Sequence, residues 1–146
     1  MRGQSRSVSG SDMLVKYIKR LYDKEFLMIS EHIYRSIRLR GEYSYLSDLF
    51  NTLAEQEAYD FRTLGDMLLS LGVDPKVQPR ARNGYGGENV SIEKILQYEA
   101  DVLEKYLSEL GRVMTLCRGG ELYLKLDEIY KRTGEWQACL LRMLRS

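Results

Sequence analysis

The sequence predicts an all-α fold, a four-helix bundle made of two antiparallel hairpins joined by one long crossover. Three observations lead to this prediction. Apolar residues recur at helical spacing in four long runs. The two prolines of the chain, Pro75 and Pro79, lie in one short stretch, so long helices are allowed elsewhere. No stretch alternates apolar and polar residues with a period of two, so strands are not expected.

The four runs place helices at about 12–40, 43–72, 91–117 and 121–145, so that residues 11–146 form the bundle. Residues 1–10 are rich in Ser, Gly and Arg, and we expect them to be a disordered tail. Glycines separate the runs, and Ser91 is expected to cap the third helix. The apolar positions that define the four stripes include Leu14, Ile18, Leu21, Leu46, Leu53, Leu64, Leu96, Leu103, Leu110, Leu126, Ile129 and Leu140.

The lengths of the connections predict the topology. A few residues around Gly41 join the first two helices, and a few around Gly119 join the last two, so each pair should form an antiparallel hairpin. The middle connection, over residues 73–90, is long enough to run the length of a bundle. Two hairpins joined by one such crossover is the predicted arrangement.

Composition and charge exclude several classes of function. The formal net charge is +1, which gives no electrostatic reason to expect a nucleic-acid partner. No apolar run is long enough for a membrane span, and the N-terminal residues lack the apolar region of a signal peptide. We therefore expect a cytoplasmic protein, in which Cys117 and Cys139 are buried thiols.

Acidic residues lie on the apolar faces of three predicted helices. At 100° per residue, Glu25 shares the face of the first stripe, Glu57 and Asp60 that of the second, and Glu99 that of the third. Each lies near the middle of its helix, so a bundle would bring them to a similar level. A buried carboxylate needs protons, cations, hydrogen bonds or metal ions to compensate its desolvation. Carboxylates on facing bundle helices are common ligands of iron and manganese.

The stretch 53–65 reads Leu-Ala-Glu-Gln-Glu-Ala-Tyr-Asp-Phe-Arg-Thr-Leu-Gly. It resembles the second-helix motif of the ferritin-like di-metal proteins of the rubrerythrin and bacterioferritin type. Those proteins carry Glu on the first and third helices and Glu-x-x-His on the second and fourth. Here Glu57 takes the Glu place and Asp60 takes the His place. The resemblance extends over about residues 12–145 and implies a ferritin-like bundle with a carboxylate metal site.

Two further stretches resemble motifs of the same family. Glu25 is followed seven residues later by His32, where the family commonly has Tyr, and Glu99 is followed seven residues later by Tyr106. The resemblance implies that His32 and Tyr106 support the site, whereas Glu25 and Glu99 are ligands. From the residues alone, His32 is expected to be a core histidine that contacts a neighbouring acid, with metal ligation as the alternative.

The fourth predicted helix departs from the family pattern. Its apolar stripe places Glu135 nearly opposite the inner face, and Glu128 likewise. The inward positions are Thr133, in place of the bridging Glu, and Trp136, in place of the His. Thr is a poor metal ligand and Trp is none, so two ligands are lost. We expect Trp136 to fill the space of the second metal.

The sequence thus predicts a divergent ferritin-like protein with a degraded di-iron site. Glu25, Glu57, Asp60 and Glu99 could hold at most one Mn, Fe, Mg or Ca ion. We favour a metal-free cluster over bound metal, with the acids neutralised by shared protons or by arginines near them, Arg35 or Arg132. We expect no robust di-iron chemistry and favour a protein that is not an enzyme. The alternative is a ferritin-like oxidoreductase of the ferroxidase or peroxidase type.

Two further hypotheses concern partners. The first is a non-catalytic bundle that forms a homodimer through its first two helices, as ferritin-like proteins commonly do. The second is a protein that binds a small molecule of unknown identity in a cavity that the lost metals leave between the helices. The aromatic side chains expected at the dimer interface are Tyr22, Tyr34, Tyr43, Tyr45 and Tyr59.

Overall fold

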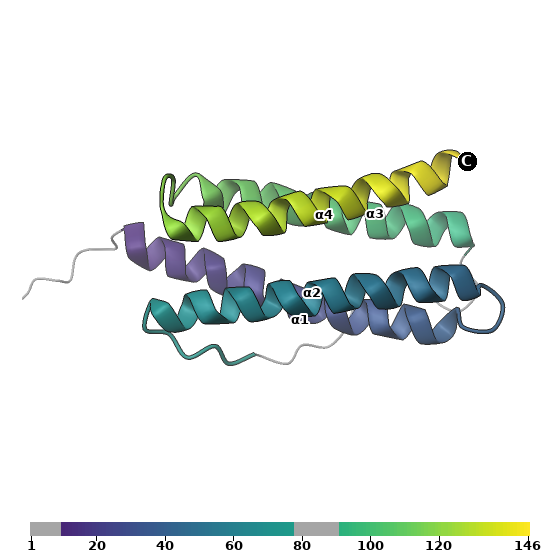
Figure 1. Cartoon of the computed structure of the whole chain (residues 1–146), viewed down its shortest axis with the longest axis horizontal. Coiled ribbons are helices and arrows are strands. Elements are labelled where there is room, and N and C mark those ends of the chain that lie inside the picture. The colour runs from purple at the N-terminus through teal and green to yellow at the C-terminus, as the bar shows by residue number, and fades with distance from the viewer. Residues whose placement is uncertain (1–9, 78–90) are drawn as a thin grey trace, which may run out of the picture. The chain divides into compact units, whose positions relative to one another are not determined.

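The computed structural model describes residues 10–77 and 91–146. It confirms the predicted all-α class, two helical hairpins joined by a long crossover (Figure 1). The predicted tail over 1–10, except for Gly10, and most of the crossover lie outside the described residues. No helix in the described ranges is long and apolar enough to cross a membrane. The helices are α1 (Gly10–Arg38), α2 (Ser44–Ser70), α3 (Ile92–Met114) and α4 (Glu121–Arg145).

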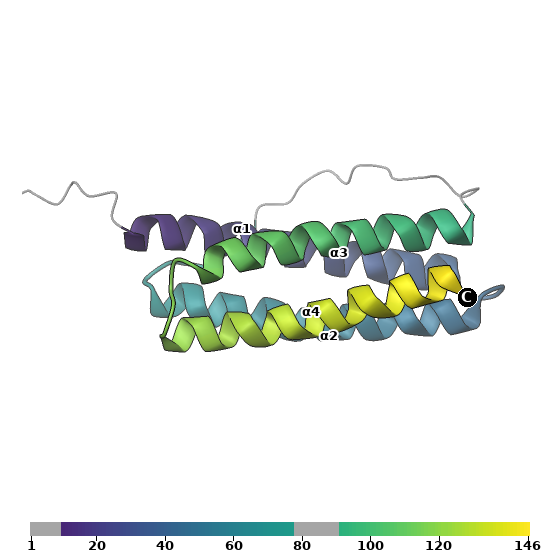
Figure 2. The same cartoon turned by 90° about the horizontal axis from the view of Figure 1, so that it is seen from above.

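The chain divides near residue 80 into two compact units. The first unit contains the α1–α2 hairpin and the second contains the α3–α4 hairpin, and within each hairpin the two helices pack side by side (Figures 1 and 2).

The C-terminal end of α2 is fixed by a glycine. Gly72 has a φ of +84°, a left-handed conformation that costs glycine little. The amide of Val73 donates to the carbonyl of Leu68 at 2.9 Å, and the amide of Gly72 donates to that of Leu69 at 3.0 Å. These bonds satisfy carbonyls that the helix end would otherwise leave exposed.

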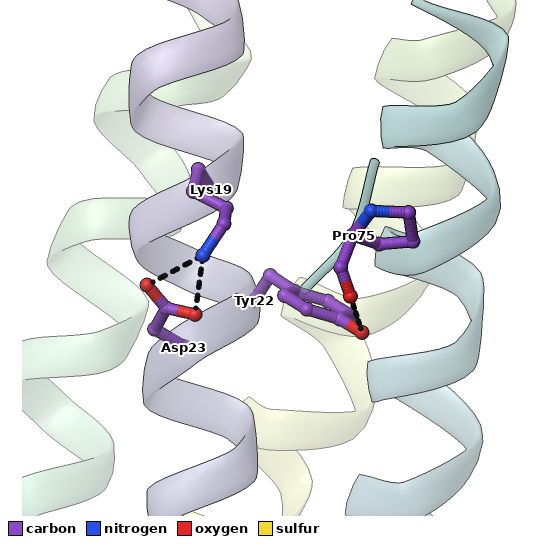
Figure 3. Close-up of polar contacts among 4 residues, drawn as sticks. All are labelled: Lys19, Tyr22, Asp23 and Pro75. Carbon is purple, nitrogen blue, oxygen red and sulfur yellow. Dashed lines mark hydrogen bonds and ion pairs between the residues drawn. The ribbon is translucent and has the colours of Figure 1, made fainter. Parts of the chain in front are cut away.

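Tyr22 attaches the chain that follows α2 to α1 (Figure 3). Its ring stacks on Phe61 of α2, with 4.2 Å between ring centroids, and its hydroxyl donates to the carbonyl of Pro75 at 2.7 Å. Gly65 makes room for the ring, since a Cβ at that position would lie 3.2 Å from Tyr22 Cε1. Burial, with Asp23 and then Asp74 nearby, raises the pKa of the Tyr22 hydroxyl. Tyr22 is thus buried within its own hairpin. The prediction that its side chain is available for a dimer interface is wrong.

The second hairpin begins with the predicted cap. Ser91 has an extended backbone, and its hydroxyl accepts a hydrogen bond from the amide of Lys94 at 3.2 Å. At the other end, α3 stops at Met114, three residues before the predicted end. The chain tightens there, because the Leu116 amide donates to the Val113 carbonyl, three residues back, at 2.9 Å. Gly119, with a φ of +77°, then turns the chain into α4.

The cysteines are less buried than predicted. Cys117 and Cys139 are both free thiols, and both are half-buried. Cys117 follows the end of α3, with its Sγ 3.7 Å from the Val113 carbonyl oxygen. Burial raises the pKa of the Cys117 thiol, so it is less reactive as a nucleophile than an exposed thiol at the same pH.

Candidate metal centre

The register of the first hairpin brings two predicted ligands to the same level. Glu25 is as far in sequence from Arg38, where α1 ends, as Glu57 is from Ser44, where α2 starts. In an antiparallel hairpin with a short turn, equal distances from the turn mean equal height along the axis. Both carboxylates are buried, with exposed fractions of 1% for Glu25 and 4% for Glu57.

Asp60 belongs to the same level of this hairpin. The next residue, Phe61, has its ring against two side chains of α1: Tyr22, at 4.2 Å between centroids, and Phe26, at 5.9 Å. These two aromatic residues flank Glu25 in the sequence, so Glu25 lies beside the 60–61 segment of α2. Asp60 is also buried. The first hairpin therefore buries three carboxylates within a short length of its interior.

His32 forms a buried polar contact that joins α1 to α2. Its Nδ1 lies 2.7 Å from Oε1 of Glu57, and both side chains are buried. An ionised carboxylate only accepts, so the Nδ1–H of His32 donates when Glu57 is charged. The imidazole also stacks on Phe50, with 5.6 Å between centroids. His32 is thus a core histidine that contacts a neighbouring acid, as the sequence indicated.

Among the described residues of the first hairpin, two buried carboxylate oxygens accept no hydrogen bond. They are Oε1 of Glu25 and Oε2 of Glu57, although both residues take part in other polar interactions. An oxygen of this kind is suited to a proton or a cation, because its lone pairs have lost water without gaining a donor. The chemistry of this donor set, buried carboxylate oxygens, fits a hard divalent cation.

Among the buried polar residues near the turn of this hairpin, the sequence interpretation missed Glu31, Ser36 and Ser47. Glu31 and Arg35 are buried on α1. Ser47 of α2 donates its hydroxyl to the Ser36 carbonyl at 2.6 Å, which joins the two helices near the turn. The signal was available: Glu31 lies three residues after the buried Met28 and four before Arg35, a helical spacing that keeps it beside the core.

The second hairpin presents a different set of side chains. Glu99 and Tyr106 of α3 are almost fully buried, and Thr133 of α4 is buried at 7% exposure. Glu99 is as far in sequence from the end of α3 as Trp136 is from the start of α4. The hairpin register therefore brings Trp136 to the level of Glu99, with Thr133 one turn away.

Trp136 is only half-buried, less than expected of a side chain that fills an interior space. Two acids of α4 lie outside the inner face, as helical periodicity predicted. Glu135 and Glu128 are both exposed, so neither is available as an inward ligand. Along this face of α4, a hydroxyl and an indole occupy the positions at which the family pattern has Glu and His.

Comparison with known proteins identifies the fold. No protein-family model matches the chain, and no curated protein matches it by sequence. Solved structures do match. One is the bacterioferritin of Desulfovibrio desulfuricans, a protein described with a diiron site in different catalytic states. The match has a TM-score of 0.82 and covers 95% of this chain and 84% of that chain, at 13% sequence identity.

The chain has the ferritin-like fold. At 13% identity the likeness concerns the fold alone, so any metal site has to be judged from this chain's own residues. Within the described ranges, no group of three or more His, Cys, Asp or Glu side chains is arranged so that it could hold a metal ion. Thr133 and Trp136 supply no ligand, and one oxygen of Glu57 is held by His32. The residues present do not fit a two-metal centre.

Proposed function

We propose that this protein is a divergent ferritin-like bundle whose buried carboxylates form a degraded metal site. On this proposal the site binds at most one divalent cation and performs no robust di-iron chemistry. The candidate ligands are Glu25, Glu57 and Asp60 of the first hairpin, and Glu99 of the second is the carboxylate that the sequence pattern adds to them. The observation that supports it best is the burial of all four carboxylates while Thr133 and Trp136 replace the ligands of α4.

The donor set favours particular cations. Carboxylate oxygens bind Mn²⁺, Fe²⁺, Mg²⁺ and Ca²⁺. Without the Glu-x-x-His motifs, the site offers no imidazole at the positions where the family has them. Asp60, which takes the His place of α2, is a shorter side chain with an oxygen donor. A cation held here would therefore be bound by oxygens alone, and the contact of His32 with Glu57 would orient one of them.

A metal titration tests the proposal. The purified chain is stripped with chelator, incubated with excess Mn²⁺ or, without oxygen, Fe²⁺, and freed of unbound metal before elemental analysis. We expect no more than one ion per chain. On admission of oxygen, Fe²⁺ should be oxidised no faster than in buffer, since the two-metal centre is incomplete. Two tightly bound ions per chain, or rapid oxidation of Fe²⁺, would overturn the proposal.

Two matched variants locate any bound ion. Glu57→Gln keeps the size of the side chain and removes the buried charge, so it should lower the metal content. Glu135→Gln makes the same change at an exposed position of α4 and should leave the content unchanged. A wild-type chain that binds no ion would favour the metal-free form, in which the acids are neutralised by protons and hydrogen bonds.

A second candidate function, self-association, is favoured by exposed apolar side chains on the first hairpin. Tyr45 and Tyr59 of α2 are 69% and 55% exposed, and Ile33 and Ile37 of α1 are 43% and 55% exposed. Large side chains of this kind are typical of interfaces. We propose that they pair two copies of the chain. Sedimentation velocity should then show a dimer that Tyr59→Ser weakens, and a monomer at high concentration would contradict this function.

A further inference from the structure

A pocket lies at the turn of the second hairpin, apart from the buried carboxylates. Its volume is about 430 Å³, within the usual range for sites that bind small molecules. Gly111 and Met114 of α3, Arg118 of the turn, and Tyr123 and Tyr130 of α4 are among its lining residues. The helical rise along α3 separates Gly111 from Glu99, the proposed ligand on the same helix, by about 18 Å. None of the proposed metal-site residues lines the pocket.

The space exists because α3 carries a glycine where a side chain would fill it. A Cβ at Gly111 would lie 3.8 Å from Cε2 of Tyr130, at the distance of ordinary van der Waals contact. Any longer side chain there would extend into the pocket. Met114, which is buried, supplies an apolar and polarisable surface. Tyr123 and Tyr130 add two aromatic rings, so the pocket offers flat apolar surfaces as well as hydroxyl groups.

The charge at the pocket is positive, and no acid among the described residues pairs with it. Arg118 is exposed and makes no ion pair or hydrogen bond with the residues that the structure describes. Glu121, the acid closest to it in sequence, pairs instead with Lys125 at 3.9 Å. The turn also leads into the start of α4, where the N-cap is Gly120 and no side chain caps the first amides. The helix dipole therefore adds to the positive potential of Arg118.

We propose that this pocket binds a small aromatic carboxylate. The guanidinium of Arg118 matches a carboxylate with two parallel hydrogen bonds. The rings of Tyr123 and Tyr130 and the thioether of Met114 pack against the aromatic ring of the ligand. Neither contact alone selects this class, but together they require a ligand with both a ring and an anionic group. The inference is independent of the metal proposal, because the two sites share no residue.

An NMR titration of the full chain tests the inference, with chelator present so that metal plays no part. Benzoate is compared with benzyl alcohol, which has the ring without the charge, and with acetate, which has the charge without the ring. We expect benzoate to shift the amide signals of residues 111–130 saturably and to bind at least about tenfold more tightly than either control ligand. Equal binding of benzoate and acetate, or no saturable shift, would overturn the proposal.

Variants then test separately the contact with the carboxylate and the space for the aromatic ring. Arg118→Gln should weaken benzoate binding about tenfold, whereas Arg112→Gln, a change at an exposed arginine that does not line the pocket, should leave it unchanged. Gly111→Leu should abolish binding by filling the pocket. If that variant folds poorly, Arg118→Gln decides the matter, because its side chain is exposed. Equal affinities of Arg118→Gln and Arg112→Gln would contradict the inference.

Discussion

The first hairpin buries Glu25, Glu57 and Asp60 together with His32, whereas the second buries Glu99 opposite a helix that offers Thr133 and Trp136. Both hairpins are long and antiparallel and have short turns. They differ in how far their stability depends on hydrogen bonds and ion pairs to buried charged side chains. Carboxylates in the first hairpin require hydrogen bonds, protons or a cation, because burial removes their water. On α4, the corresponding positions hold Thr133 and Trp136. Neither side chain carries a charge, so neither needs a charged partner to compensate for lost water.

Under the proposed function, the two hairpins show how a ferritin-like bundle loses a metal site without losing its fold. Buried ligands without a metal destabilise a protein, and replacing them with neutral side chains removes that cost. Under the proposed function, Thr133 and Trp136 are such replacements on α4 of the second hairpin. The first hairpin buries its acids and engages Glu57 with His32 at 2.7 Å. The first hairpin should therefore be the more sensitive to changes of buried polar residues.

The largest expected effect comes from breaking the His32–Glu57 pair. His32→Phe keeps an aromatic ring beside Phe50 but removes the donor to Glu57. Removing one partner of a buried pair should lower the free energy of unfolding by about 3–5 kcal/mol. Urea denaturation at neutral pH measures this loss, and the double variant His32→Phe/Glu57→Leu should recover much of it.

The control for that change lies on the second hairpin. Lys131 and Asp127 of α4 pair at 3.1 Å, but the lysine side chain is 72% exposed. Lys131→Ala should therefore cost no more than about 1 kcal/mol. If His32→Phe costs as little as Lys131→Ala, the buried pair does not stabilise the first hairpin.

The second prediction concerns an acid introduced on α4, at the position where the family pattern has Glu. Thr133→Glu places a carboxyl group at a buried position of the second hairpin. The acid would be protonated or strained there, and we expect stability at neutral pH to fall by about 2–3 kcal/mol. If the metal proposal is right, added Mn²⁺ should restore part of the loss, because a ligand that binds the folded state stabilises it.

Ser108→Glu, at an exposed position of α3, is the matched control for Thr133→Glu. It adds the same group in water and should change stability by no more than about 0.5 kcal/mol. Thermal melts with and without Mn²⁺ compare the two variants. Equal losses in both would show that position 133 is not a buried one, and the contrast between the hairpins would fail.

The third prediction concerns the pH dependence of the first hairpin. The pKa of Tyr22 is raised above its ordinary value of 10.0, chiefly by burial, so the folded state favours the neutral hydroxyl. The stability from this group is fully present below pH 10 and is lost as the pH rises through the higher folded-state pKa. Ionisation also removes the donor to the Pro75 carbonyl.

Tyr22→Phe tests that dependence. At neutral pH it should cost about 1 kcal/mol, the usual net value of one hydrogen bond. In the alkaline range the variant should lose less stability with rising pH than the wild type does. Tyr45→Phe, at a side chain that is 69% exposed, should follow the wild-type curve. Identical alkaline curves for Tyr22→Phe and the wild type would contradict the assignment.

Much of this architecture could be predicted from the sequence, because helical periodicity acts within one helix. It placed Glu25, Glu57, Asp60 and Glu99 on apolar faces and Glu135 outside, and each is buried or exposed accordingly. Features that depend on the packing of two helices against each other were harder to predict from the sequence. The identity of the acid that His32 contacts depends on the hairpin register, which the turn length sets.

Tyr22 is a second case in which the periodicity of one helix does not predict a contact with its neighbour. The structure buries its ring against α2 because Gly65 leaves space there. Nothing in the pattern of α1 alone shows that α2 has a glycine at the matching height. The pocket at the second turn depends in the same way on Gly111 of α3 and Tyr130 of α4. Such pairings emerge only once both helices of a hairpin are placed.

The smallest expected effect compares two glycines inside helices, one in each hairpin. An alanine in place of a helical glycine gains about 1 kcal/mol in helix propensity. At Gly134 of α4 a Cβ would meet nothing within 4 Å, so Gly134→Ala should gain most of that amount. At Gly65 of α2 the Cβ would lie 3.2 Å from Cε1 of Tyr22.

The Tyr22 ring cannot yield easily, because it is held by the stack on Phe61 and by the hydrogen bond to Pro75. Gly65→Ala should therefore gain nothing or lose up to about 1 kcal/mol. In a Tyr22→Phe background the ring is no longer tied to the Pro75 carbonyl, so Gly65→Ala should approach the gain at Gly134. Urea denaturation of the wild type, Gly65→Ala, Tyr22→Phe and the double variant measures this coupling, with Gly134→Ala as the reference. A gain at Gly65 equal to that at Gly134 with Tyr22 intact would mean that the ring is not fixed, and that the first hairpin tolerates added volume as readily as the second.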